Sequence, residues 1–493
     1  MIKVCFSFQR NFTRLQHAMA VEMKNRGIAS KFCGYCTSHK SEKILKEQEE
    51  IDYGTVISDD EMHEMAKKVK LDMEYLKTFE AEYGIPNLWP YILTDRCIMR
   101  NFPKEAFSYK PAYDHDGMLR LIQVMSKTII KMLDKEKPDV VIFPLVGSMG
   151  VHLLYEIVKK RGIKTLFLLA ARIDDRVLVC DNAYNDFTNI LKHAKPTDED
   201  FKEARKFLKR FTGEEEVRYD GIYGAKKVSN PLGFLGKEIV GYYDYVTKYW
   251  AIQKYLRKNK MAKDYTLFTP YYFTKNRLKR FAKRLIGYRG LFVKPDFKED
   301  YSYFPLHVEP EVAIQVWAPY YDNQIEICRT IAKALPVGQK LYVKEHPNML
   351  YERSKSYYEK LQRIPNVKLI DAFVGSQKIV RHAKAVFTIT GTAGMEAYFM
   401  GKPVLTFGSV MYNAIPSIKK IGKIHDLPMQ VKDMLENYEF DREEAEEFVA
   451  KLYNLSEPVS YVKIWFEWTL DEIRASKDFR TVMRLIEEGL QKF

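Results

Sequence analysis

A buried strand, a turn of small residues and the start of a helix follow one another in Val386-Phe387-Thr388-Ile389-Thr390-Gly391-Thr392-Ala393-Gly394-Met395-Glu396-Ala397. The first N–H groups of a helix have no acceptor within it, and the helix dipole favours an anion there. Gly391 and Gly394 can bring the backbone close to a ligand. The stretch therefore predicts an anion site at the end of a strand in an α/β domain. A well-capped helix explains the turn without a ligand, and this alternative stays open.

Three side chains of the same turn are suited to a nucleotide. Thr390 and Thr392 carry hydroxyls that can donate to a phosphate or cap the helix. Glu396 lies in the first helical turn, where its carboxylate can accept hydrogen bonds from ribose hydroxyls. These residues are the first candidates for binding a nucleotide-activated substrate.

A second group of polar residues follows an apolar strand in Leu341-Tyr342-Val343-Lys344-Glu345-His346-Pro347-Asn348. Parallel sheets bind ligands at the carboxyl ends of their strands, so these side chains are expected near the turn. Pro347 restrains His346 to an extended conformation, which should hold its imidazole toward the cleft. Lys344 and His346 can then donate to a phosphate and stabilise the charge on a leaving group. A structural histidine at a strand end is the alternative.

Strands alternate with helices on both sides of these motifs. Apolar strands are predicted at 2–8, 28–32, 137–144, 164–169, 303–306, 340–344, 367–369, 385–389 and 403–407. The alternation predicts an α/β fold of two parallel-sheet domains that face a ligand cleft, with helical insertions between 41 and 107. The expected divisions are 1–225 for an N-terminal acceptor-side domain, 226–297 for a basic helical linker, 298–425 for a C-terminal ligand-binding domain and 426–493 for C-terminal helices.

Composition narrows the class of partner. The 493 residues carry a formal charge of +14, which suits an anionic small molecule or an anionic lipid surface. Neither paired Cys/His fingers nor an aromatic RNA-binding strand is visible, so nucleic acid is not expected as a partner. Among the six cysteines only Cys33 and Cys36 form a close pair, and no second Cys/His pair lies at ligand spacing, so we expect reduced cysteines. No apolar run approaches the ~18 residues that cross a bilayer. We therefore expect a cytoplasmic protein.

Four carboxylates are candidates for a catalytic base. Glu309 and Glu311 follow the first strand of the second domain, and Asp174 and Asp175 follow a strand of the first. A carboxylate in such a place can deprotonate an acceptor hydroxyl. Solvated loops and surface ion pairs explain the same residues, so both interpretations stay open.

The residues that bind the acceptor, the substrate that receives the transferred group, are expected in the first domain at the carboxyl ends of its strands. They are Arg10, Ser148, Arg172 and Arg176. Arginine binds carboxylates and phosphates through two parallel hydrogen bonds, which suits an acidic acceptor. No convincing paired-carboxylate metal site is visible, so catalysis is predicted to need neither a metal ion nor a cofactor.

Basic and apolar residues interleave at near-helical spacing in 273–289, which contains no Asp or Glu. The basic residues are Lys275, Arg277, Lys279, Arg280, Lys283, Arg284 and Arg289. A helix of this kind binds anionic membranes, at about 1 kcal/mol per basic residue near the surface. Peripheral contact with the inner face of the membrane is one interpretation, and a solvated connector is the other.

The motifs together resemble the bacterial capsule polysaccharide biosynthesis proteins, the group that includes the β-Kdo transferases. The resemblance covers about residues 303–412. It is carried by Phe304-Pro305-Leu306-His307-Val308-Glu309-Pro310-Glu311, by the Leu341–Pro347 and Thr390–Glu396 stretches, and by Gly401-Lys402-Pro403-Val404, Phe407-Gly408 and Tyr412.

This resemblance implies a GT-B glycosyltransferase with two Rossmann-like domains. The C-terminal domain would hold a nucleotide-sugar donor, CMP-Kdo or a similar activated sugar, and the N-terminal domain would hold a polysaccharide or glycolipid acceptor. His346 would contact the donor phosphate, and Glu396 with the Thr390–Gly394 turn would contact the nucleotide. The last helix would cross back to the N-terminal domain.

Three other functions fit the same architecture. A UDP-sugar 2-epimerase shares an element like His346-Pro347-Asn348, although it usually carries a Ser-Gly-Gly turn followed by paired glutamates. A polyol-phosphate transferase would release CMP from CDP-glycerol. A scaffold would bind nucleotide or glycan without turnover.

Overall fold

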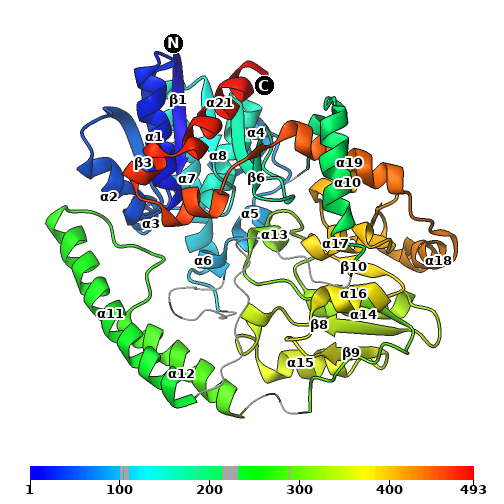
Figure 1. Cartoon of the computed structure of the whole chain (residues 1–493). Helices are drawn as coiled ribbons and strands as arrows, with labels where there is room; N and C mark the ends of the chain where they lie inside the picture. The colour runs from blue at the N-terminus through cyan, green and yellow to red at the C-terminus, as the bar shows by residue number, and fades with distance from the viewer. Residues whose placement is uncertain are drawn as a thin grey trace.

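Two sheets, each dominated by parallel strands, organise the chain in the computed structural model (Figure 1). The structure describes residues 1–99, 104, 110–184, 186–213, 231–286, 288 and 290–492. The N-terminal sheet has the order β13-β6-β5-β4-β1-β2-β3, and the C-terminal sheet has the order β12-β11-β10-β7-β8-β9. This confirms the predicted α/β, GT-B-like class with two Rossmann-like domains. The predicted boundary near residue 225 lies outside the described residues.

The N-terminal sheet is built around β1, whose residues from Val4 to Phe8 are all buried. Its strands are β1 (Ile2–Phe8), β2 (Ala29–Cys36), β3 (Tyr53–Ser58), β4 (Val140–Phe143), β5 (Lys164–Ala170), β6 (Arg176–Cys180) and β13 (Glu457–Pro458). Its helices are α1 (Phe12–Asn25), α2 (His39–Glu47), α3 (Asp59–Ala66), α4 (Met73–Tyr83), α5 (Trp89–Leu93), α6 (Arg96–Met99), α7 (His115–Glu136), α8 (Met149–Lys160), α9 (Thr188–Lys192) and α10 (Asp198–Lys209).

Three strands of this sheet are absent from the sequence prediction, namely β3, β6 and the two-residue β13. The segment 41–107 is predicted to hold helices only, which is wrong for β3 because this edge strand pairs in parallel with β2. β3 is only half-buried, so it lacks the continuous apolar run of a central strand. β6 is also missed, and it runs antiparallel to β5 after a tight turn at Arg172–Asp175.

The C-terminal sheet carries both sequence motifs at one edge. Its strands are β7 (Tyr301–Pro305), β8 (Lys340–Lys344), β9 (Val367–Ile370), β10 (Val386–Thr388), β11 (Val404–Thr406) and β12 (Lys419–Lys420). Its helices are α13 (Val312–Gln315), α14 (Gln324–Ala334), η1 (Pro347–Met349), α15 (Lys355–Gln362), α16 (Ser376–His382), α17 (Thr392–Phe399), η2 (Met411–Ala414), η3 (Ile424–Asp426) and α18 (Leu427–Asn437). β7 lies between β8 and β10, so the carboxyl ends of these three strands are adjacent.

The chain ends against the N-terminal sheet. Its last elements are α19 (Arg442–Leu455), η4 (Lys463–Glu467), α20 (Leu470–Ala475) and α21 (Lys477–Lys492). α21 packs on β5 and β6, and Gly489 makes the approach close because a Cβ there would lie 2.8 Å from Val179 Cγ1. The C-terminal helix therefore joins the core of the first sheet.

A two-helix arm connects the two sheets. It consists of α11 (Pro231–Lys258) and α12 (Pro270–Ile286), and it runs along one side of the molecule in Figure 1. Tyr245 of α11 stacks on Phe273 of α12 with ring centroids 3.8 Å apart. Lys283 Nζ donates to the carbonyl oxygen of Glu352 at 2.6 Å, which ties α12 to the C-terminal domain.

The basic stretch predicted to meet a membrane lies mainly on α12. Lys275, Lys279 and Arg280 are exposed there, as is Leu278, whose exposed fraction is 61%. Arg289 lies outside the described residues. No helix in the described part of the chain combines the length and the apolar character that a membrane span requires. Contact with an anionic membrane stays a prediction.

Candidate functional site

A cleft of about 790 Å³ opens at the carboxyl ends of β7, β8 and β10. Both predicted motifs line it. The lining includes Lys344, His346, Pro347, Thr390, Gly391, Thr392, Glu396 and Glu311 from the C-terminal domain, and Arg172 from the N-terminal domain. Trp317, which also lines the cleft, donates from Nε1 to the carbonyl oxygen of Ala183 at 3.1 Å and so joins the two domains. The site therefore lies where the domains meet.

The turn after β10 is fixed by hydrogen bonds of its own. His307 Nε2 accepts the Thr390 N–H at 3.2 Å, and Thr388 Oγ1 accepts the Gly391 N–H at 3.0 Å. The Thr390 hydroxyl donates to the carbonyl oxygen of Ala313 at 2.7 Å, so this hydroxyl is already engaged within the protein. Burial, with Arg353 and His346 nearby, lowers the pKa of His307 to about 3, which keeps its imidazole neutral.

The first helical N–H groups are the donors that this turn offers to an anion. Thr392 and Ala393 are the first residues of α17, so their N–H groups have no acceptor within the helix, and both residues line the cleft. Gly394 serves packing, because a Cβ there would lie 2.6 Å from Tyr412 Oη. The glycine is explained by a protein neighbour, whereas the sequence interpretation assigned it to ligand approach.

His346 is held as a neutral hydrogen-bond donor. Its backbone is extended, with φ −67° and ψ 130°, as Pro347 predicts. Nδ1 accepts the Asn348 N–H at 3.2 Å, which places the proton on Nε2. Burial lowers the pKa of His346 to about 4, with Lys344 and Arg353 adding to the effect. At neutral pH the imidazole therefore donates from Nε2 without carrying a charge.

Lys344 and Glu396 are positioned by partners on α16. Lys344 Nζ donates to Ser376 Oγ at 3.1 Å, and Gln377 Nε2 donates to Glu396 Oε2 at 3.0 Å. Lys344 is 5% exposed and Glu396 is 8% exposed, so neither is an ordinary solvated surface charge. α16 therefore positions both Lys344 and Glu396, which line the same cleft.

A buried arginine that sequence reasoning missed supports both strand ends. Arg353 pairs with both carboxylate oxygens of Glu345, directly after β8, and donates from Nη2 to the carbonyl oxygen of His307 at 2.7 Å, directly after β7. Tyr358 Oη donates to the same Glu345 carboxylate at 2.8 Å. Arg353 and Glu345 lie in loops with no recognisable spacing, so only the three-dimensional structure brings them together.

Residues 278–419 match the capsule polysaccharide biosynthesis protein family. The match contains every cleft residue of the C-terminal domain named above and confirms the resemblance that the motifs predict. Protein FixF of Sinorhizobium fredii is 24% identical over 145 residues, which are 29% of this chain and 32% of FixF. The aligned part thus spans about a third of that relative.

Two solved structures show how distant the similar proteins are. The beta Kdo 2,7 transferase of Thermosulfurimonas dismutans KpsC is 11% identical with a TM-score of 0.36, and the alignment covers 73% of this chain and 89% of that one. The UDP-GlcNAc 2-epimerase from Methanocaldococcus jannaschii is 13% identical with a TM-score of 0.25, covering 92% and 99%.

The two glutamates after β7 point to different places. Glu309 is 7% exposed and turned inward, where it accepts from Gln324 and lies 3.6 Å from Arg353 Nη2. Glu311 is solvent-accessible within the cleft. The surrounding cleft walls raise its pKa by burial, against the opposing pull of Arg172 and Arg96. Of the two glutamates, Glu311 is the one that lines the cleft.

The remaining predicted residues do not line the cleft. Asp174 accepts from Arg210 at 2.5 Å and from Tyr453, and Arg176 donates to Ser456 Oγ at 2.9 Å, so both hold the sheet edge against α10 and α19. The carbonyl oxygen of Asp175 accepts the Val459 N–H at 2.9 Å. The other two are Arg10, whose N–H donates to Ser41 Oγ at 2.9 Å, and Ser148, the N-cap residue of α8. Of the acceptor-side candidates, only Arg172 reaches the cleft.

The buried arginine gives a stability prediction. Replacing Arg353 with Met leaves the Glu345 carboxylate buried without its cation, so we expect a loss of about 3–5 kcal/mol in the free energy of unfolding. Urea denaturation of the C-terminal domain, followed by tryptophan fluorescence, measures this. Arg329→Met removes a surface pair with Glu326 and should cost less than about 1 kcal/mol. Equal effects of the two changes would show that the Arg353 pair has no special role.

Proposed function

We propose that the protein is a glycosyltransferase of surface polysaccharide synthesis, taking sugar from a nucleotide-activated donor. The observation that carries the proposal is one cleft in which His346, the α17 N-terminus and Glu396 converge, within the segment that matches the capsule family. Free N–H groups and a neutral imidazole donor suit the phosphate of a nucleotide. A carboxylate in the same cleft suits ribose hydroxyls. The proposed donor is CMP-Kdo or a similar activated sugar.

Each cleft residue has a place in the proposed transfer. The donor phosphate lies against the Thr392 and Ala393 N–H groups, and His346 Nε2–H donates to it as the bond from phosphate to the anomeric carbon breaks. Lys344 adds positive charge for the leaving nucleotide. An acceptor hydroxyl attacks the anomeric carbon, and Glu311 takes its proton. Closure of the two domains excludes water that would hydrolyse the donor.

Arg172 is proposed to orient the acceptor. It is the N-terminal candidate that lines the cleft, and its guanidinium can bind a carboxylate or phosphate on an acidic glycan or glycolipid. Because Arg172 also opposes the rise in the Glu311 pKa, acceptor binding and base strength are linked in one pair of side chains. With an uncharged acceptor, Glu311 would be the only charged partner of Arg172 in the proposed complex.

Nucleotide binding is the first test. Thermal unfolding is measured with CMP, UDP, GDP and CDP, and we expect one of them at about 100 times its Kd to stabilise the fold by about 2.7 kcal/mol. His346→Ala and Glu396→Ala should each weaken binding at least about tenfold, because each removes a contact to the ligand. His425→Ala, on the exposed surface of the same domain, should respond like wild type. A wild type that responds to no nucleotide would contradict the donor site.

The pH dependence of transfer tests the base. Glu311 acts when deprotonated, and burial raises its pKa, so kcat/KM should rise with pH through a midpoint above the ordinary glutamate value of about 4.3. His346 stays neutral above about pH 4 and adds no further limb in that range. Glu311→Gln should lower kcat by about 10²–10⁴-fold and remove the acid limb. Asp175→Asn should keep the wild-type kcat and the acid limb. If Asp175→Asn loses them and Glu311→Gln keeps them, the base lies in the N-terminal domain.

Product analysis separates the other functions. An acceptor-independent conversion of UDP-sugar identifies an epimerase, and release of CMP from CDP-glycerol identifies a polyol-phosphate transferase. Donor binding with neither hydrolysis nor transfer identifies a scaffold. Acceptor-dependent release of the nucleotide is the result that the proposal requires.

A further inference from the structure

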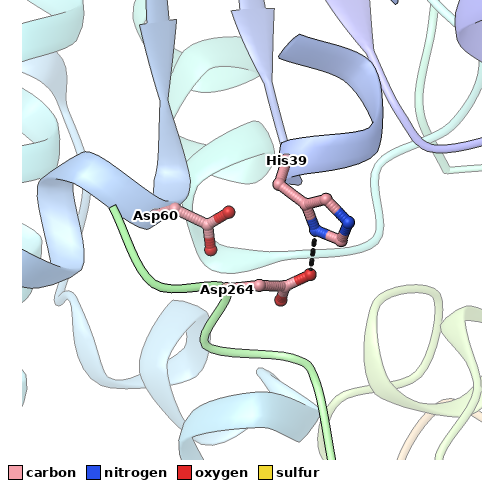
Figure 2. Close-up of side chains that lie close together, drawn as sticks. All are labelled: His39, Asp60 and Asp264. Carbon is pink, nitrogen blue, oxygen red and sulfur yellow. Dashed lines mark hydrogen bonds and ion pairs between the residues drawn. The ribbon is translucent and has the colours of Figure 1, made fainter. Parts of the chain in front are cut away.

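Three side chains from distant parts of the chain meet beneath the arm (Figure 2). His39 begins α2, Asp60 lies in the first turn of α3, and Asp264 belongs to the loop between α11 and α12. One nitrogen and two carboxylate oxygens, one from each residue, lie within 4.8 Å of one another. The exposed fractions are 4% for His39, 0% for Asp60 and 4% for Asp264. The cluster is therefore a closed polar site in the protein interior.

The hydrogen bonds of the cluster engage every carboxylate oxygen except Asp60 Oδ2. His39 Nδ1 contacts Asp264 Oδ2, and Asp264 Oδ1 accepts from both the N–H and the hydroxyl of Thr266 at 2.7 Å. Asp60 Oδ1 accepts the Tyr265 N–H at 3.1 Å. Asp60 Oδ2 is buried and has no hydrogen-bond partner among the described residues. A buried polar atom of this kind ordinarily has a partner, and an ion is one of the standard explanations when none is found.

The negative charges around the cluster also favour a bound cation. Asp60 and Asp264 are both buried, and the buried carboxylate of Asp59 and the carboxylate of Glu42 lie near Asp60 as further negative groups. Two ionised carboxylates in such surroundings call for two positive charges or for protons. A divalent cation would supply two positive charges at once.

We propose that His39, Asp60 and Asp264 bind a divalent transition-metal ion of the Zn²⁺ or Mn²⁺ class. An imidazole nitrogen in the ligand set favours these ions over Mg²⁺ and Ca²⁺, which prefer oxygen ligands throughout. The charges of Asp60 and Asp264 balance the ion, and water completes its coordination. The ion would use Asp60 Oδ2, the one oxygen left without a partner.

The site is structural and fixes the arm. His39 and Asp60 come from the N-terminal domain, whereas Asp264 lies at the bend between α11 and α12, so the ion joins the arm to that domain. At its other end the arm is held by Lys283 and the Glu352 carbonyl oxygen. A groove of about 990 Å³ lies between α12 and the C-terminal domain. None of the three ligands lines the cleft, so the ion has no step in the proposed transfer.

The test uses the full chain freed of metal with EDTA and then dialysed. ZnCl₂, MnCl₂, MgCl₂ and CaCl₂ are added separately, and bound metal is counted by mass spectrometry while thermal unfolding is followed. We expect one equivalent of Zn²⁺ or Mn²⁺, a rise in Tm of at least about 2 °C at saturation, and a much smaller response to Mg²⁺ and Ca²⁺. Co²⁺ bound in place of the ion should give visible absorption bands.

Asp60→Asn is the decisive variant because it keeps the shape of the side chain and removes one ligand charge. In EDTA it should be as stable as wild type or more stable, since a buried like-charge contact disappears. With ZnCl₂ it should gain no stability and bind at least about tenfold more weakly. Asp116→Asn alters an exposed His115–Asp116 pair and should keep the wild-type metal response.

Two outcomes overturn the proposal. If wild type retains no stoichiometric metal and its Tm does not respond, the cluster is a hydrogen-bonded group that shares protons. If Asp60→Asn binds Zn²⁺ as wild type does, the ion is held elsewhere. Circular dichroism in EDTA checks that the variant is folded, so loss of binding is not confused with loss of structure.

Discussion

The cleft at the carboxyl ends of β7, β8 and β10 depends on one buried guanidinium. Arg353 is 2% exposed and joins the ends of β7 and β8 through the Glu345 carboxylate and the His307 carbonyl oxygen. An arginine fork suits this task because its donors are fixed in one plane and keep their charge when buried. With the two strand ends held together, His307 contacts the turn after β10, and His346 lines the same cleft. Arg353 thus fixes the relative positions of the two strand ends that carry His307 and His346.

The same arginine shapes the electrostatics of the site. Arg353 and Lys344 both oppose a proton on the His346 imidazole, and burial does so more strongly, so the ring stays neutral and donates from Nε2. In the proposed transfer, positive charge for the leaving phosphate comes from Lys344 and from helix N–H groups, and the N–H groups keep their state across the working range of pH. Glu311 is the group whose pKa is moved toward that range. Binding and proton transfer are thereby assigned to separate side chains.

The sequence predicts the C-terminal domain well because its strands are apolar, short and bounded by turn residues. β8 has the predicted bounds, and the Thr390–Glu396 turn and His346 do share one cleft. The packing role of Gly394 and the engaged hydroxyl of Thr390 are invisible in the sequence, because both depend on Tyr412 and Ala313, which lie elsewhere along the chain. A local pattern indicates where a ligand site lies but not which of its donors are already used.

The N-terminal domain is predicted less fully for a physical reason. Its charged residues after β5 look like a binding site, yet a tight turn sends the chain back as β6, and Asp174 and Arg176 face α10 and α19. Of these charged residues, only Arg172 lines the cleft.

The cluster of His39, Asp60 and Asp264 could not be predicted from the sequence either. Asp264 is more than 200 residues from Asp60, and no spacing rule connects them.

The central claim is that phosphate oxygens lie between the α17 N-terminus and His346. A crystal structure of the protein with its preferred nucleotide tests it most directly. The account predicts a phosphate oxygen within hydrogen-bond distance of both the Thr392 N–H and His346 Nε2, with the ribose beside Glu396. A nucleotide bound at the N-terminal sheet or in the groove under the arm, with the cleft unchanged, would contradict it.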